Sequence, residues 1–197
     1  MSDANEPKLK KLGVRDSKLL SPTRRVHLAK ELEKIALDYV VLKISPQEID
    51  EHRTVSNLNK LEIEKMAHLV NVLRPDVAYI DAIEANTSAF KRKILTHLEH
   101  APEIVAENYA DRRYPVVSAA SIVAKVTRDA EISALHERYG NFGSGYPSDP
   151  DTVKFLKEWM ESNSELPDCV RKSWATAIVL HKQRQQKSLQ QFGSDDE

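Results

Sequence analysis

The chain has 197 residues, a length typical of one domain with a substantial core. Hydrophobic residues make up 41% and charged residues 30%, and 29 basic against 30 acidic side chains give a net charge of -1. This balance is that of an ordinary globular protein and excludes a strongly basic chain, so any positive surface for nucleic acid must be local.

The lone cysteine, Cys169, excludes an internal disulfide and a multi-cysteine metal site, and it suits a reducing compartment. No apolar run approaches the roughly 18 residues that a membrane span requires, and the segment 1–11 is polar. We therefore expect a cytoplasmic protein without a membrane helix or a secretory signal.

The first third of the chain alternates helical and extended patterns. A helix is predicted over 21–37, where Ser and Pro suit its first turn, and a second helix over 58–73. The β-branched run 39–44 predicts a short strand, closed by a turn at the Ser-Pro pair 45–46.

The same alternation continues through the middle of the chain. The apolar run 77–80 predicts a buried strand that delivers Asp81 at its tip, and 103–107 predicts another strand. Thr87 can cap the helix between them. We expect this helix to place Phe90, Ile94, Leu95 and Leu98 inward.

A long helix is predicted over 116–139, followed by a surface loop of turn-forming residues at 143–150. Two further helices are expected near 152–162 and 168–186, before a polar tail. Strands that alternate with helices indicate an α/β fold in which helices cover a sheet.

A polar stripe on the long helix is the first candidate for a site. It consists of Ser118, Ser121, Lys125 and Asp129, which fall on one side of a helix. Such a stripe is usually a solvated face, with Lys and Asp as a surface pair. Alternatively, small residues on the other faces let the helix pack on a sheet, and the stripe faces a cleft; these residues are Val116, Ala120, Val123 and Ala124.

Asp81 is the second candidate, because carboxylates at the ends of buried strands often hold hard cations such as Mg²⁺ or Mn²⁺. A turn or cap aspartate is the alternative interpretation. Hydrolysis with two metals needs ions about 3.5 to 4 Å apart and several carboxylates, so Asp81 and Asp129 alone are too few.

Five blocks of sequence stand in a recognisable order. They are Val-Arg-Asp-Ser-Lys at 14–18, Tyr-Ile-Asp-Ala at 79–82, Val-Ser-Ala-Ala-Ser-Ile-Val-Ala-Lys-Val-Thr-Arg-Asp at 117–129, Gly-Ser-Gly-Tyr-Pro-Ser-Asp-Pro at 143–150 and Val-Arg-Lys-Ser-Trp at 170–174. In this order they resemble successive motifs of ribonuclease HII, in its archaeal form. The resemblance implies a mixed ribonuclease H-like sheet covered by helices.

The resemblance also implies an activity: hydrolysis of the RNA strand of RNA/DNA hybrids, including cuts at ribonucleotides embedded in DNA. Asp81 and Asp129 are then catalytic metal ligands for Mg²⁺ or Mn²⁺, and attack by a metal-bound water leaves a 5′-phosphate. Tyr146 matches the aromatic residue that senses the RNA-to-DNA junction. The other implied contacts or supports of the substrate are Arg15, Lys18, Asn59, Ser118, Ser121, Lys125, Arg171 and Trp174.

Two departures from the family pattern stand out. Nothing before Lys18 resembles the family's Asp-Glu-Ala-Gly-Arg-Gly segment, which carries two more carboxylates, so we expect two strands to be missing through a truncated gene model or an internal start. Asn108 and Tyr109 occupy positions where the family commonly has His and Lys, before the aspartate matched by Asp111.

The C-terminal end suggests a protein partner. Gln186, Leu189 and Phe192 follow the Gln-x-x-Leu-x-x-Phe spacing of peptides that dock on the replication sliding clamp. Gly193 stands where a second aromatic residue is usual.

These observations predict one catalytic domain over 1–150, a helical C-terminal part of the same domain over 151–185 and a flexible tail over 186–197. We expect a monomer that acts on RNA/DNA hybrids. The alternatives are a catalytically incomplete form that only binds the hybrid, and an unrelated α/β binding protein.

Overall fold

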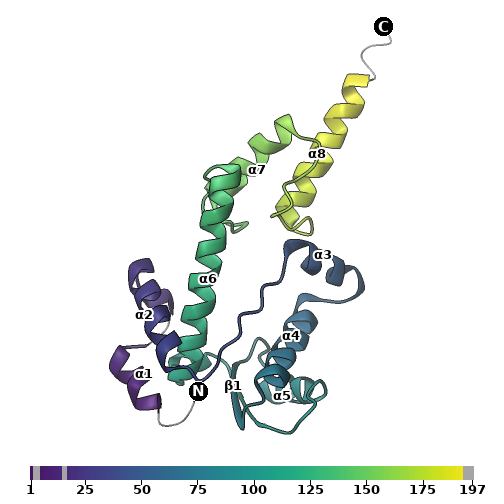
Figure 1. Cartoon of the computed structure of the whole chain (residues 1–197). Helices are drawn as coiled ribbons and strands as arrows, with labels where there is room; N and C mark the ends of the chain where they lie inside the picture. The colour runs from purple at the N-terminus through teal and green to yellow at the C-terminus, as the bar shows by residue number, and fades with distance from the viewer. Residues whose placement is uncertain (2–4, 15–16, 193–197) are drawn as a thin grey trace. The chain divides into compact units, whose positions relative to one another are not determined.

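A computed structural model describes the backbone of residues 1, 5–14 and 17–192, and the side chains up to residue 186 (Figure 1). The chain forms two compact units, one from residues 1–43 and 59–130, the other from residues 44–58 and 131–197. The predicted division near residue 150 stays a prediction. Within the described residues, no helix combines the length and apolar character that crossing a bilayer demands.

The first unit contains a parallel pair of strands. β1 (Val77–Asp81) pairs with β2 (Glu103–Glu107), and Asp81 lies opposite Glu107 in the register. The connection between them includes α5 (Thr87–Leu95), as a parallel crossover requires. Both predicted strands and this helix are present, but β1 is not a buried strand, because Ala78 is its one buried residue. Asn86 rather than Thr87 caps α5, since its Oδ1 accepts the amide of Ala89 at 2.9 Å.

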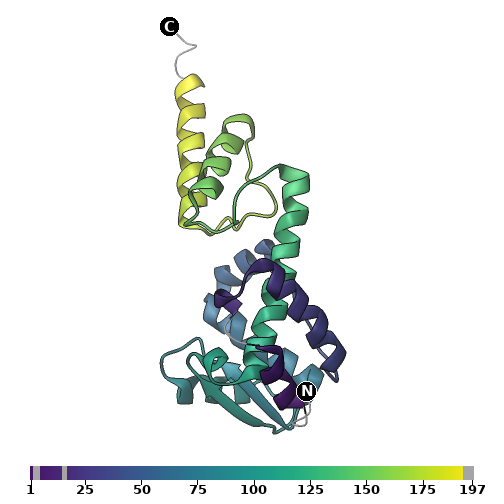
Figure 2. The same cartoon turned by 90° about the vertical axis from the view of Figure 1, so that its left-hand side faces the viewer.

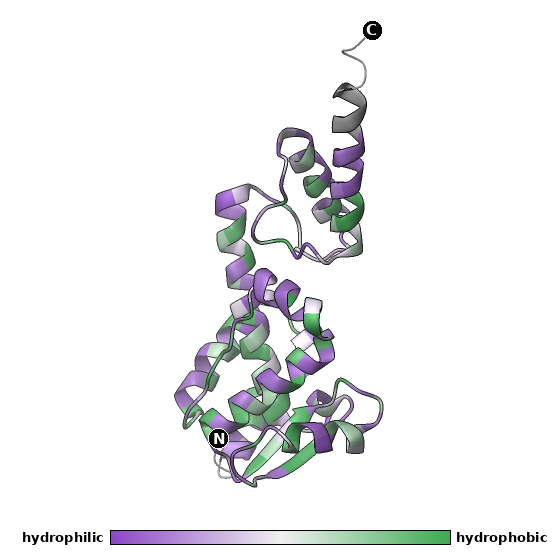
Figure 3. Cartoon of the chain, turned by 90° about the vertical axis from the view of Figure 1, so that its right-hand side faces the viewer, coloured by the Kyte–Doolittle hydropathy of each residue, from purple (hydrophilic) through white to green (hydrophobic). Residues whose placement is uncertain are grey.

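Two helices supply the core on one face of this sheet. α4 (Leu58–Leu73), predicted with these bounds, lies beside β1 together with α5 (Figure 1). Figure 3 colours hydrophobic stretches of the strands green, and the buried strand residues are Ala78 and Ile104. The core consists of Ile63, Val70, Ala78, Ala82, Phe90, Ile94 and Ile104, with Leu98 packed against it. The inward placement of Leu95 was wrong, because this side chain is exposed at the last turn of α5.

A second core of the same unit joins three helices. α1 (Glu6–Leu12) and α2 (Pro22–Ile35) pack against the N-terminal part of α6 (Pro115–Tyr139), as Figure 2 shows. The core contains Leu9, Leu20, Leu28, Ala29, Leu32, Ala119 and Ile122. The expectation that Ala120 and Ala124 pack on a sheet was wrong, because both are exposed and the neighbouring positions face α1 and α2.

The predicted strand over 39–44 was also wrong. This segment is extended but forms no strand, and Tyr39, Val40 and Val41 are exposed. A β-branched run becomes a strand only when a neighbouring backbone accepts and donates its hydrogen bonds, and β1 and β2 pair with each other. The following turn is instead the start of α3 (Pro46–Val55), where Ser45 Oγ accepts the amide of Glu48 at 3.0 Å.

The second unit is helical in its described residues. α7 (Pro150–Ser162) packs against α8 (Ala175–Phe192), and their core contains Leu156, Met160, Leu166, Val170, Ala177 and Leu180. The helix predicted from residue 168 begins at 175. The preceding turn is held by α3, because the carboxylate of Asp50 accepts the amides of Lys172 at 2.6 Å and Ser173 at 3.2 Å.

Replacement of Phe90 by alanine tests the core beside the sheet. Phe90 is fully buried, so we expect Phe90→Ala to lower the free energy of unfolding by about 3 to 5 kcal/mol in urea denaturation. Leu37→Ala is the control, because Leu37 is 74% exposed and its loss should change stability by less than about 0.5 kcal/mol. Equal effects of the two substitutions would contradict this description of the core.

Candidate active site

The carboxyl ends of the two strands meet at one edge of the sheet. Asp81 ends β1 opposite Glu107, and the amide of Ala82 donates to the Glu107 carbonyl at 2.9 Å, so the pairing continues past the last strand residue. Asp81 is exposed, and its Oδ1 accepts the amide of Ala110 at 3.1 Å. The segment that leaves β2 therefore orients the carboxylate that ends β1.

That segment is held on both sides of Tyr109. The side-chain amide of Asn108 donates to the carbonyls of Ala82 at 2.9 Å and Glu84 at 3.0 Å, which ties it to the turn after β1. Tyr109 has a left-handed backbone, with φ 59°, and the 3₁₀ turn η3 (Ala110–Arg112) follows it. This reversal of the backbone brings Asp111 close to the end of β2.

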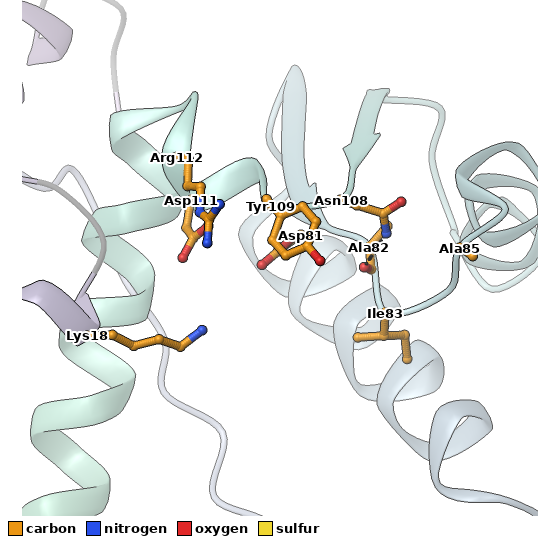
Figure 4. A pocket seen from close by; sticks show the side chains of 9 residues that line it. All are labelled: Lys18, Asp81, Ala82, Ile83, Ala85, Asn108, Tyr109, Asp111 and Arg112. Atoms are coloured by element: carbon orange, nitrogen blue, oxygen red, sulfur yellow. Dashed lines mark hydrogen bonds between the residues drawn. The ribbon is translucent and has the colours of Figure 1, made fainter.

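A cavity of about 430 Å³ opens at this edge (Figure 4). Its lining comprises Lys18, Asp81, Ala82, Ile83, Ala85, Asn108, Tyr109, Asp111 and Arg112. Lys18 reaches into the view from one side, while Asp81, Tyr109 and Asn108 lie on the other. Two carboxylates, two cationic groups and an aromatic ring thus line one cavity.

The polar stripe of α6 is buried at Ser118 and partly exposed at its other members, among which the predicted pair of Lys125 and Asp129 is present. Ser118 is buried and its Oγ donates to the carbonyl of Asp111, which fixes the backbone of that residue. Ser121 Oγ and Ser17 Oγ form a hydrogen bond of 2.9 Å. Lys125 donates to Asp129 Oδ1 at 2.7 Å. The stripe therefore holds other segments of the first unit in place.

Asp129 completes a network around Arg25. Arg25 Nη2 donates to Asp129 Oδ2 at 3.1 Å, while its Nη1 donates to the carbonyls of Ser17 at 3.3 Å and Leu20 at 2.7 Å. These carbonyls flank the turn η2 (Ser17–Leu19), which carries Lys18. The network thus attaches the turn with the cavity's lysine to α6.

The charges around Asp129 set its ionisation. Burial opposes ionisation of the carboxyl, but hydrogen bonds and positive charges from Lys125 and Arg25 outweigh burial and lower its pKa below the ordinary 3.8. The Arg25 side chain is 11% exposed and that of Asp129 38% exposed. Asp129 is therefore an ionised partner of Arg25 and Lys125, with Arg128 Nη1 3.9 Å from its Oδ1, and it does not line the cavity that contains Asp81.

Tyr146 belongs to the second unit and is 46% exposed. Its loop is ordered by Asp149, whose Oδ2 accepts both the amide and the hydroxyl of Ser144 at 2.6 Å. A Cβ on Gly143 would lie 2.6 Å from that same oxygen, and Gly143 has φ +75°, so glycine is required there on both counts. The loop thus presents an exposed ring on a fixed backbone.

The remaining predicted site residues are spread over both units. Arg171 is half-buried in the second unit, next to the amides that Asp50 accepts. Asn59 is exposed near the start of α4 and does not line the cavity of the first unit. Gln186 is exposed on α8. Arg15 and the side chains of Leu189 and Phe192 lie outside the described residues.

Four polar or aromatic residues of the cavity were not predicted as site residues from the sequence: Asn108, Tyr109, Asp111 and Arg112. A signal for Asp111 was present, because it follows a predicted strand closely, as Asp81 does. The oxygen donors of Asp81 and Asp111 suit Mg²⁺ or Mn²⁺, which bind through one or two carboxylates with water in the other positions. No group of three or more potential metal-binding side chains occurs among the described residues.

Comparisons with known proteins identify the family. The family model of ribonuclease HII matches residues 1–177. The chain belongs to the ribonuclease HII family. The ribonuclease HII of Pyrococcus abyssi is 44% identical over 188 residues, which cover 93% of this chain and 83% of the relative.

Solved structures of ribonuclease HII relatives have the same fold. The crystal structure of ribonuclease H2 from Pyrococcus horikoshii matches with a TM-score of 0.89 and 40% identity, over 94% of this chain and 88% of the other. The ribonuclease HII of Archaeoglobus fulgidus, solved in complex with PCNA, matches with a TM-score of 0.83 and 42% identity, over 91% and 85%. The predicted α/β ribonuclease H-like class is confirmed.

Acid titration tests the ion pairs of Asp129. Since its pKa is lowered in the folded state, their contribution to stability is complete above the ordinary value and is lost as the pH falls through the folded-state pKa. We expect the free energy of unfolding to fall more steeply from about pH 4 to about pH 2 in the wild type than in Asp129→Asn. Urea denaturation at each pH measures this, and equal slopes would rule the ion pairs out as a source of stability.

Proposed function

We propose that this chain is an endoribonuclease that hydrolyses the RNA strand of RNA/DNA hybrids and cuts at single ribonucleotides embedded in DNA. The family supplies the activity, since its members are named for it. The observation that carries the proposal in this chain is the cavity that Asp81 and Asp111 share with Lys18 and Arg112. Carboxylates that hold a cation, next to positive groups that hold phosphates, are what hydrolysis of a phosphodiester requires.

The family uses divalent metal ions, and we assign Mg²⁺ or Mn²⁺ to Asp81 and Asp111. Such an ion, when bound, polarises the scissile phosphate and lowers the pKa of a nearby water molecule. The assignment replaces Asp129 with Asp111. Both oxygens of Asp129 accept hydrogen bonds from cationic side chains, and those charges oppose the approach of another cation.

The other residues in and next to the cavity have separate tasks in this proposal. Ala110 fixes the orientation of the Asp81 carboxylate through its amide, so this ligand needs little rearrangement. Lys18 and Arg112 attract the phosphates that flank the cut. Asn108 holds the turn after β1 and thereby keeps the cavity open at this edge.

We divide the remaining predicted residues into contacts and supports. Tyr146, Arg171, Asn59 and Arg15 are proposed contacts with the hybrid. Ser118, Ser121, Lys125 and Asp129 are proposed supports, because their hydrogen bonds run to Asp111, Ser17 and Arg25 or to one another. The alternative of a form that only binds the hybrid is not favoured, because relatives named for the enzyme are similar to this chain over most of its length.

Cleavage of a duplex with one ribonucleotide in one strand tests the function. With Mg²⁺ or Mn²⁺ we expect a cut at the ribonucleotide, and we expect Asp81→Asn and Asp111→Asn each to lower kcat by roughly 100-fold or more, the scale on which groups that stabilise transition-state charge act. Addition of EDTA should abolish cleavage.

The matched control for this experiment is Asp129→Asn. It removes a carboxylate of the same unit that lies outside the cavity and affects it only through the turn that carries Lys18, so kcat should fall by no more than about tenfold. A loss as large as that of Asp81→Asn would return the metal-ligand role to Asp129. Circular dichroism melts of the three variants exclude unfolding as the cause.

We also propose that the C-terminal end binds a sliding clamp. The relative from Archaeoglobus fulgidus was solved with PCNA, and this chain has the spacing of Gln186, Leu189 and Phe192. The Leu189→Ala, Phe192→Ala double variant should weaken binding to an archaeal clamp by at least about tenfold in calorimetry, because it removes both apolar anchors. Unchanged affinity would exclude this segment, and a variant with Ala at Gln190 and Gln191 is the control.

A further inference from the structure

Tyr109 is the aromatic residue that lines the cavity, and the function proposed above gives it no part. Tyr109 is 66% exposed, and it lines the cavity with Asp81, Asp111 and Lys18. Figure 4 shows its ring among the charged side chains of that cavity. Leaving a large aromatic ring in water forgoes the stabilisation that burial provides, and an exposed aromatic face in a binding cleft is typical of a stacking surface.

The backbone holds this ring at the cavity at some cost. Tyr109 has φ 59° and ψ 35°, a left-handed conformation that is uncommon for a residue with a bulky side chain. The hydrogen bonds of Asn108 to Ala82 and Glu84, and of Ala110 to Asp81, fix the residues on either side. The position of the ring is thus imposed by the same contacts that orient Asp81.

Arg112 adds a positive charge to the ring. Its guanidinium carbon lies 4.8 Å from the centroid of Tyr109, a cation–π distance. These groups match the parts of a nucleotide. The aromatic face can stack on a base or sugar, the guanidinium can neutralise a phosphate, and the two carboxylates can hold a cation that binds a phosphate oxygen.

We propose that the ring of Tyr109 stacks on a nucleoside of the substrate strand next to the scissile phosphate. This inference rests on the proposed function and adds a specificity-determining contact to it. Arg112 then serves two purposes, because it braces the ring from one side and neutralises the adjacent phosphate. The nucleoside enters between Tyr109 and the rest of the cavity, so its position relative to Asp81 is set by a ring that the backbone fixes.

Binding measured without cleavage tests the inference directly. We expect Tyr109→Ala to weaken affinity for a fluorescent duplex with one ribonucleotide by roughly tenfold, as loss of one stacking residue does, in anisotropy titrations with EDTA present. Tyr109→Phe keeps the ring and should bind within about twofold of the wild type. Tyr39→Ala is the matched control, because Tyr39 is an exposed tyrosine of the same unit that does not line the cavity.

A glycine variant separates binding from folding. Tyr109→Gly relieves the left-handed backbone, so its thermal midpoint should equal or exceed that of the wild type while its affinity falls as in Tyr109→Ala. A merely structural role predicts the opposite, that is, loss of stability with affinity recovered wherever the protein is folded. That result would overturn the inference.

Substrates with an abasic site at each position around the ribonucleotide identify the stacked group. If the ring stacks on a base, Tyr109→Ala and the wild type become equal at one abasic position; if it stacks on the sugar, the difference persists at all of them. Both results support the proposal. Equal affinity of Tyr109→Ala and the wild type on the intact duplex would overturn it.

Cleavage of the same duplex with Mg²⁺ or Mn²⁺ tells this inference apart from the proposed function. A wild type that cleaves while Tyr109→Ala binds normally refutes the stacking role alone. A wild type that binds with the expected dependence on Tyr109 but never cleaves refutes the proposed function alone. A wild type with no affinity for the duplex refutes both.

Discussion

The site depends on the parallel pairing of β1 with β2. Because the strands run in the same direction and Asp81 lies opposite Glu107, their carboxyl ends and the turns that follow them meet at one edge. The amide of Ala110 then reaches the carboxylate of Asp81, and Asp111 follows one residue later. A shift of the register by one residue would turn Asp81 toward the helices and separate it from this turn.

The cavity also needs a contribution from the beginning of the described chain. Lys18 is far from Asp81 in sequence, and it is held by the network of Arg25, Asp129 and the carbonyls around η2. Arg25 is nearly buried, so its charge requires a partner, and Asp129 supplies it. The positive charges of Arg25 and Lys125 stabilise the ionised form of the Asp129 carboxyl. They account for its lowered pKa without a metal ion.

Much of this arrangement was predictable from local pattern. The helix Leu58–Leu73 and the strands Val77–Asp81 and Glu103–Glu107 follow from periodicity and from turn-forming neighbours, since their hydrophobic faces have a core to enter. The helix Pro46–Val55 was also encoded, by a serine at the cap and a glutamate three residues later. The run 39–44 failed because strand formation depends on a partner that a local pattern does not contain.

The roles of the carboxylates were less accessible. The order of the motifs suggested Asp129 as a metal ligand, whereas the aspartate that lines the cavity with Asp81 is Asp111. Only the folded chain shows that both carboxylate oxygens of Asp129 are bonded to cationic side chains. The role of Tyr109 was also not predictable, because the residue type alone indicates neither its left-handed backbone nor its exposure. Pattern identifies elements well, but the pairing of side chains across them requires tertiary structure.

A crystal soaked in Mn²⁺ tests the central claim most directly, because anomalous scattering locates the ion. We predict an anomalous peak within bonding distance of carboxylate oxygens of both Asp81 and Asp111, with Asp129 still bonded to Arg25 and Lys125. A peak coordinated by Asp129 and not by Asp111 would contradict the account.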